Sequence, residues 1–262
     1  MTETYVIGDI HGEYDRLVPL LRDAGLVDDR LRWSGGDSLL VFMGDYFDRG
    51  PDGVSVVDLV MRIQAEAREA GGRVDALLGN HEPLILSALW MPDGFSNHPS
   101  GTFYGDWLAN GGRESDLRRL TEAHIAWMLA LPAMLRDGDW LFLHADSAVY
   151  LRYGSSVEEV NRAMSALLRR RDPVEYNRLF GEIVRDFGDH RPEGHDKVSL
   201  MLDTYGAQRL VHGHTLISNV TRQSPQMVEE ALVYDGGRCV NVDGGVGEGG
   251  QGFVYRIPSP TL

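Results

Sequence analysis

The chain has 262 residues, 43% of them hydrophobic and 24% charged, and its formal net charge at pH 7 is −14. This length and apolar content suffice to bury one large hydrophobic core. The acidic balance disfavours nonspecific binding to nucleic acid or to anionic membranes, because such partners select Lys and Arg.

The compartment is predicted from two further features. The single cysteine, Cys239, excludes an internal disulfide and a zinc–thiolate cluster. The N-terminal "MTETYVIGDIHG" lacks the basic region and apolar segment of a secretory signal, and no apolar run approaches the ~20 residues of a membrane span. We therefore expect a cytoplasmic protein that binds neither membrane nor nucleic acid; its oligomeric state is left open.

Short apolar runs recur along the chain, and each ends at a group of polar residues. They cover residues 6–7, 39–43, 77–78, 141–143 and 210–211. Runs of this length beside glycine predict buried strands. Residues 13–25 and 52–72 have helical periodicity, although Pro19 opposes the first helix. Alternating strands and helices predict βαβ units.

The second half of the chain has a different pattern. Residues 147–206 contain several helical segments, which we interpret as helical cover over the same core because no Pro/Ser-rich linker separates them. Three further strands are predicted at 231–235, 238–243 and 252–257, with the glycine-rich segment 244–252 as a hairpin loop. The whole chain, residues 1–262, is predicted to form a single domain.

The polar groups after five strands are candidate metal ligands. In sheets of this kind ligands bind beyond the C-terminal ends of the strands. Carboxylate, imidazole and amide oxygen suit a divalent ion such as Mn, Fe or Zn. Two such ions about 3.5–4 Å apart form a clamp for phosphate-ester hydrolysis, and Asp45 is the candidate bridging carboxylate. The candidate ligands are Asp9, His11, Asp45, Asn80, His144 and His214.

Three motifs carry a family resemblance. "GDIHG", "GDYFDRG" and "GNHE", in this order, resemble the signature motifs of the phosphoprotein phosphatase family of calcineurin-like metallophosphoesterases. "FLHAD", "HGHT" and "DWLANGGRES" resemble its bacterial branch, which holds protein Ser/Thr phosphatases, symmetrical diadenosine tetraphosphatases and Shewanella-like phosphatases. The resemblance implies an α/β fold: a β-sandwich of two mixed sheets flanked by helices.

The resemblance also implies a metal arrangement. Asp9 and His11 would hold one divalent ion, Asp45 would bridge, and a second ion would be held by Asn80, His144 and His214. Manganese is favoured over iron or zinc. A hydroxide that bridges the two ions would attack phosphorus in line.

Other motif residues are assigned to catalysis and substrate binding. His81 corresponds to the general acid, and Asp48 orients it. Arg49 binds phosphate, and Asn80 also contacts substrate. "EIVRDFG" nominates Arg185 as the second phosphate ligand, with Arg191 as the alternative.

Two positions depart from the family pattern. Asp146 stands where the family usually has glycine, and it is interpreted as a further ligand, a restriction on substrate entry or a solvent-facing residue. "VHGHT" contains two histidines; the motif register makes His214 the ligand and leaves His212 as a lesser candidate.

The favoured function is therefore a metal-dependent phosphatase acting on phosphomonoesters, chiefly on phosphoserine or phosphothreonine in proteins. The alternative substrate class is a symmetrical dinucleoside tetraphosphate such as diadenosine tetraphosphate. A binding module without catalysis is disfavoured because no ligand and no acid is missing. The aromatic segment 90–107 is interpreted as core packing, with a base-stacking platform as its alternative.

Overall fold

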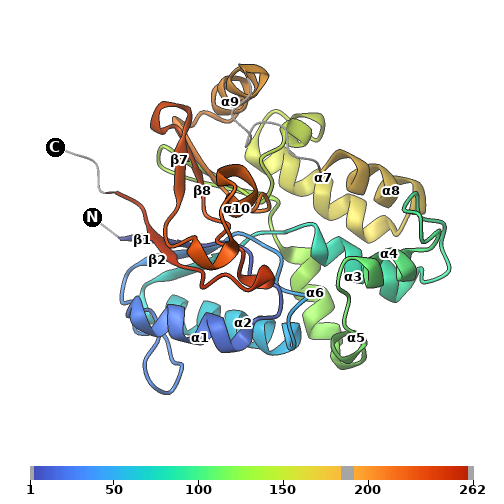
Figure 1. Ribbon diagram of the computed structural model, residues 1–262, viewed down its shortest axis with the longest axis horizontal. Helices are drawn as coiled ribbons and strands as arrows, with labels where there is room; N and C mark the ends of the chain where they lie inside the picture. Colours follow the sequence, from blue (N-terminus) through green and yellow to red (C-terminus); the bar gives the residue numbers. More distant parts are fainter. Residues whose placement is uncertain (1–2, 184–191, 259–262) are drawn as a thin grey trace.

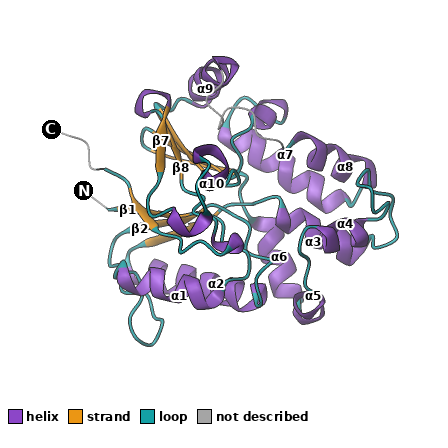
Figure 2. Cartoon of the chain, viewed as in Figure 1, coloured by secondary structure: helices purple, strands orange, loops and turns teal. Residues whose placement is uncertain are grey.

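The computed structural model describes residues 3–183 and 192–258 of the chain (Figure 1). Two sheets form its centre and helices lie outside them (Figure 2). The strands are β1 (Thr4–Ile7), β2 (Leu39–Phe42), β3 (Arg73–Ala76), β4 (Met134–Asp137), β5 (Trp140–Leu143), β6 (Arg209–His212), β7 (Leu232–Tyr234), β8 (Cys239–Asn241) and β9 (Val254–Arg256).

Both sheets are mixed, as expected. The first has the order β3-β2-β1-β9, in which β1, β2 and β3 run parallel and β9 is antiparallel to β1. The second has the order β4-β5-β6-β8-β7, with a parallel centre and an antiparallel strand at each edge. The predicted sandwich of two mixed sheets is confirmed.

Helices cover the outer faces of the sheets (Figure 1). Helices α1 and α2 lie side by side against the first sheet, and α6 to α8 cover the edge that carries β4. The helices are α1 (Tyr14–Asp23), α2 (Gly53–Ala70), α3 (His81–Trp90), α4 (Phe103–Ala109), α5 (Glu114–Arg119), α6 (Glu122–Ala130), α7 (Val157–Arg170), α8 (Pro173–Glu182), α9 (Pro192–Tyr205) and α10 (Ile217–Thr221).

Alternation along the strands explains the two layers of core. Successive side chains of a strand point to opposite faces. Val6 and Val41 belong to the cluster between the sheets, together with Phe142 and Val211, whereas neighbouring side chains such as Ile7 pack under the helices. Continuous apolar runs are therefore needed, because both faces of these strands are buried.

Some boundaries differ from the sequence prediction. Pro19 lies inside α1 rather than ending it. Leu77 and Leu78 follow β3, which already ends at Ala76. The glycine-rich segment does not close a hairpin: β8 belongs to the second sheet and β9 to the first, so the segment crosses between sheets.

The helical cover predicted at 147–206 corresponds to α7, α8 and α9 within the described residues. The single-domain interpretation stays a prediction. Among the residues that the structure describes, no helix is both long enough and apolar enough to cross a membrane. The cytoplasmic location likewise stays a prediction.

Candidate metal centre

The loops after β1, β2, β3, β5 and β6 bring the six predicted ligands to one edge of the sandwich. The described residues include two groups of three possible ligands. Within each group the ligand atoms lie within 4.8 Å of one another, and Asp45 belongs to both groups. Asp45 therefore stands where one carboxylate can serve two ions. The groups are His11, Asp45 and His81, and Asp45, His144 and His214.

Asn80 joins the second group through its amide oxygen. Its Oδ1 atom lies 2.9 Å from Nε2 of His144 and 2.9 Å from Nδ1 of His214. Nε2 of His144 lies 3.5 Å from Oδ1 of Asp45. One amide, two imidazoles and one carboxylate thus point at a common volume.

The outer hydrogen bonds fix which ring nitrogens face this volume. Nδ1 of His144 donates to the carbonyl of Met43 at 2.9 Å, and Nδ1 of His11 donates to the carbonyl of Phe47 at 3.0 Å. Their Nε2 lone pairs therefore point inward; that of His11 lies 3.5 Å from Oδ2 of Asp45. Lone pairs that converge in this way repel one another, and a divalent cation fits between them.

Buried carboxylates add negative charge to the same place. Burial raises the pKa of Asp9 well above its ordinary value, and the charges of Asp243 and Asp45 raise it further. Burial also raises the pKa of Asp45, but three surrounding histidines lower it, and the net shift is well below the ordinary value. Protons or cations must compensate this cluster.

Two acidic residues of the site were not among the sequence candidates. Asp243 follows β8, is 2% exposed, and has a pKa raised to about 7, chiefly by burial. Glu82 is fully buried and accepts the backbone N–H groups of Asp45, Tyr46 and Gly79 at 3.2, 2.9 and 2.8 Å. Glu82 therefore ties the loop after β2 to the loop after β3.

His81 is held by a chain of buried side chains. Its Nδ1 lies 2.7 Å from Oδ2 of Asp48, and Oδ1 of Asp48 accepts the indole N–H of Trp107 at 2.7 Å. Burial lowers the pKa of His81, but Asp45 and Asp48 raise it, and the net shift is upward. Trp107 lies on α4 and was not a sequence candidate.

Arg49 lies at the rim of the same site. Its Nη1 atom lies 3.4 Å from Oε1 of Glu248, a residue of the short helical turn Val246–Glu248 in the glycine-rich segment. Its carbonyl accepts Nε of Arg113 at 3.1 Å. Arg185 and Arg191, the two candidates for a second phosphate ligand, lie outside the described residues.

Asp146 and His212 lie behind the ligands. Asp146 is fully buried, so it does not face solvent, and its Oδ1 accepts the hydroxyl of Thr215 at 2.5 Å. This bond links the loop of His144 to the loop of His214. The ring of His212 contacts Tyr234, whose hydroxyl lies 2.7 Å from its Nε2.

The backbone of the site is unusual. Five residues with side chains have φ between 48° and 70°, where glycine is normally found, and they are His11, Asp45, Asp48, Arg49 and His214. Close approach explains Gly79: a Cβ at this position would lie 2.1 Å from Oδ1 of Asp45. Glycine at position 79 therefore makes room for the carboxylate of Asp45.

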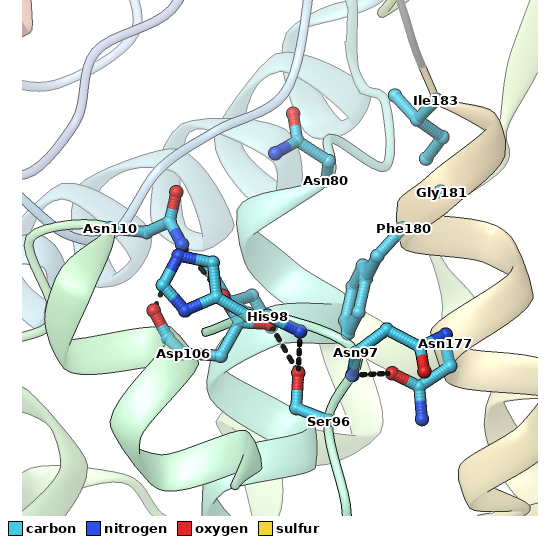
Figure 3. A pocket seen from close by; sticks show the side chains of 11 residues that line it. Asn80, Ser96, Asn97, His98, Asp106, Asn110, Asn177, Phe180, Gly181 and Ile183 are labelled. Carbon is cyan, nitrogen blue, oxygen red and sulfur yellow. Dashed lines mark hydrogen bonds and ion pairs between the residues drawn. The ribbon is translucent and has the colours of Figure 1, made fainter. Parts of the chain in front are cut away.

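A cavity of about 330 Å³ lies beside Asn80 (Figure 3). It lies between α3 and α4 on one side and α8 on the other, and the segment 96–98 contributes to its wall. Phe103 and Trp107 of the aromatic segment 90–107 are fully buried, so most of its ring surface packs in the core, although Phe95 is exposed.

Comparison with known proteins agrees with this geometry. Residues 3–218 match the family model of the calcineurin-like phosphoesterases. Shewanella-like protein phosphatase 1 of Plasmodium berghei is 28% identical over 226 residues, which cover 80% of this chain and 60% of that protein. Shewanella-like protein phosphatase 2 of Arabidopsis thaliana is 37% identical over 42% of this chain and 28% of its own length. This chain thus spans less than two thirds of the length of either relative.

A bis(5′-nucleosyl)-tetraphosphatase of Bacillus velezensis, described as asymmetrical, is 27% identical over 97% of this chain and 88% of its own length. Among solved structures, a cold-active protein-tyrosine phosphatase from a Shewanella species superposes with a TM-score of 0.73 at 21% identity, covering 98% of this chain and 75% of that one. This likeness shows the shared fold. The chain belongs to the calcineurin-like phosphoesterase family.

Proposed function

We propose that this protein is a dinuclear metal-dependent phosphatase that hydrolyses phosphomonoesters, with phosphoserine and phosphothreonine in proteins as its substrates. The position of Asp45 carries the proposal. Its carboxylate belongs to both groups of ligand atoms, which is the arrangement that a bridging ligand requires.

The ligands divide as the family motifs imply. Asp9, His11 and Asp45 would hold one ion, and Asp45 would share the other with the second set, which consists of Asn80, His144 and His214. When bound, two divalent ions activate water at neutral pH and stabilise the phosphoryl oxygens. Manganese is the favoured metal. The donor set of carboxylate, imidazole and amide oxygen agrees with it and also accepts iron or zinc.

His81 would protonate the leaving oxygen of the substrate. Asp48 accepts the Nδ1 proton, so Nε2 is the nitrogen that faces the centre, 3.9 Å from Oδ2 of Asp45. The upward shift of the His81 pKa, caused by Asp45 and Asp48, favours a proton on this nitrogen, as a general acid requires.

Arg49 would bind the substrate phosphate. Its side chain is 31% exposed at the rim, where it pairs with Glu248. An arginine in this place can bind two phosphoryl oxygens at once and stabilise their charge in the transition state. Arg185 would supply the second such contact, with Arg191 as the alternative.

The substrate class rests on the relatives and on charge. Two relatives are protein phosphatases by name, and one is a dinucleoside tetraphosphatase, which keeps a dinucleoside tetraphosphate as the second candidate. A dinucleotide carries several phosphates and needs basic groups beyond the metals. Among the residues that the structure describes, no Lys or Arg lines the cavity beside Asn80, which favours a monoester.

The test compares two substrates on the manganese-loaded enzyme. We expect a higher kcat/KM for a phosphoserine peptide than for diadenosine tetraphosphate. A preference for the dinucleotide of more than about tenfold, or ~1.4 kcal/mol in transition-state binding, would reverse the assignment.

A further inference from the structure

The cavity beside Asn80 is continuous with the metal centre through one residue. Asn80 directs its amide oxygen at His144 and His214, and it also lines the cavity (Figure 3). Leu84, one helical turn further along α3, lines the same cavity. A group attached to the leaving oxygen of a substrate would therefore enter this cavity as it passes His81, at the start of α3.

The lining combines polar and apolar side chains, and its described residues include no Lys or Arg. Three further asparagines contribute amide groups, and Phe180 contributes one aromatic face (Figure 3). The amide of Asn177 is already engaged within the protein: its Oδ1 accepts the backbone N–H of Asn97 at 2.8 Å, and its Nδ2 donates to the carbonyls of Phe95 and Pro173. Amides donate and accept hydrogen bonds and suit an uncharged polar or a cationic group. The asparagines are Asn97, Asn110 and Asn177.

Asp106 supplies the one carboxylate among the lining residues within 3–183 and 192–258. It is 7% exposed; its Oδ2 accepts the hydroxyl of Ser96 at 3.0 Å, and its Oδ1 accepts the amide of Asn110 at 2.9 Å. Both donors are neutral. Nδ1 of His98 lies 3.9 Å away, but it accepts the backbone N–H of Ser100 at 3.2 Å and therefore brings no proton to Asp106.

We propose that this cavity is the subsite for the peptide residue next to the phosphorylated residue, and that Asp106 makes it select basic or neutral side chains against acidic ones. The inference rests on the proposed phosphatase function. An acidic side chain would bring a second negative charge into a partly enclosed cavity, where repulsion is screened less than in bulk water. A basic side chain would pair with Asp106.

A polyphosphate chain fits this cavity poorly. Between the metal centre and the cavity stands the neutral amide of Asn80, and the rim cation Arg49 is paired with Glu248. Among the described lining residues, extra phosphates that entered here would meet the carboxylate of Asp106 and no Lys or Arg. The charge distribution thus selects a peptide rather than a dinucleotide as the occupant.

The experiment uses phosphoserine peptides that differ only in the residue flanking phosphoserine, which is Lys, Gln or Glu. The measured quantity is the ratio of kcat/KM for the Lys peptide to that for the Glu peptide on the manganese-loaded enzyme. We expect a ratio of at least about fivefold. It should fall toward one in Asp106→Asn, which removes the charge, and in Asn110→Lys, which offsets it.

Gln208→Lys is the matched control, because it adds the same charge just before β6, at the strand end opposite the metal centre. It should keep the full ratio. A wild-type ratio near one, or a ratio that Asp106→Asn and Asn110→Lys both leave unchanged, would overturn the subsite. Failure of the wild-type enzyme to hydrolyse p-nitrophenyl phosphate with manganese would instead overturn the proposed function.

Discussion

Nδ1 of His81 lies 2.7 Å from Oδ2 of Asp48, and neither side chain is more than 2% exposed. Asp48 uses its other oxygen to accept the indole N–H of Trp107. A histidine, a carboxylate and an indole thus form one buried chain that ends at the metal centre. Its geometry fixes both the tautomer and the direction of the ring.

The role of His81 can be separated from metal binding. His81→Ala should lower kcat by about 10²–10⁴-fold, the usual contribution of general acid catalysis. The loss should be smaller for p-nitrophenyl phosphate, whose leaving group needs little protonation. Elemental analysis should find both metals retained, whereas Asp45→Asn should lose metal. If His81→Ala also lost its metals, His81 would be a ligand, as its grouping with His11 and Asp45 permits.

Trp107 should act on kcat through Asp48. Trp107→Phe keeps an aromatic ring but removes the N–H, which leaves one buried carboxylate oxygen without its donor. We expect kcat to fall about three- to tenfold and the acidic group in the kcat pH profile to shift, with KM little changed. Trp127→Phe is the control, since it removes a different indole hydrogen bond, 2.8 Å long, to Gln64, which is not a ligand. Equal effects of both changes would mean a structural role only.

Metal removal should abolish activity. Among the described residues, Arg49 at the rim is the fixed cation that acts on the buried carboxylate of Asp9. Strong chelation should therefore stop turnover, and Mn²⁺ should restore it. Full activity in a preparation shown by elemental analysis to be free of metal would refute this.

Glu248 should compete with phosphate for Arg49. Glu248→Gln removes the pairing at 3.4 Å and should lower KM for a small monoester, and the inhibition constant of inorganic phosphate, by up to about fivefold. The effect is small because both groups are partly exposed, and it should fade at high ionic strength. The exposed Glu229→Gln should change neither constant. An unchanged phosphate affinity at low salt would show that the pairing does not matter.

The metal-free protein should lose stability as pH rises from 6.5 to about 8. Burial raises the pKa of Glu82 to about 8 and that of Asp243 to about 7, above their unfolded values, so the folded state holds these protons longer. The free energy of unfolding then falls with pH across this interval. Burial lowers the pKa of His214 to about 3, so this residue makes the free energy of unfolding rise with pH. That effect is confined to pH values below 6.5, the ordinary pKa of histidine.

Thermal melts check this dependence. The chelated protein should lose several degrees in Tm between pH 6.5 and 8, whereas Mn²⁺ should remove the loss because cations replace the protons. A Tm of the chelated protein that rises over this interval would contradict the assignment of Glu82 and Asp243.

The sequence predicted that the ligands lie together at one edge of the sandwich, because each ligand follows an apolar run that had to be a buried strand. The same pattern marks Asp243, which ends the run at β8, but no quoted motif contained it. Trp107 contacts Asp48, from which it is 59 positions away in the chain. Glu248 contacts Arg49, from which it is 199 positions away. Local periodicity carries no information on such distances, and only the packing of α4 and the strand crossover bring Trp107 and Glu248 to the site.

Five residues of the site have a left-handed backbone conformation, which lowers the stability of the fold but positions side chains of the site. Each such residue with a side chain costs roughly 1 kcal/mol or more relative to glycine. Glycine at Arg49, where φ is 64° and the side chain is partly exposed, should therefore raise the melting temperature while it removes the proposed phosphate contact. A library selected for heat resistance alone should drift toward glycine at this position. Only selection for turnover would keep the side chains in place against the preference of the backbone.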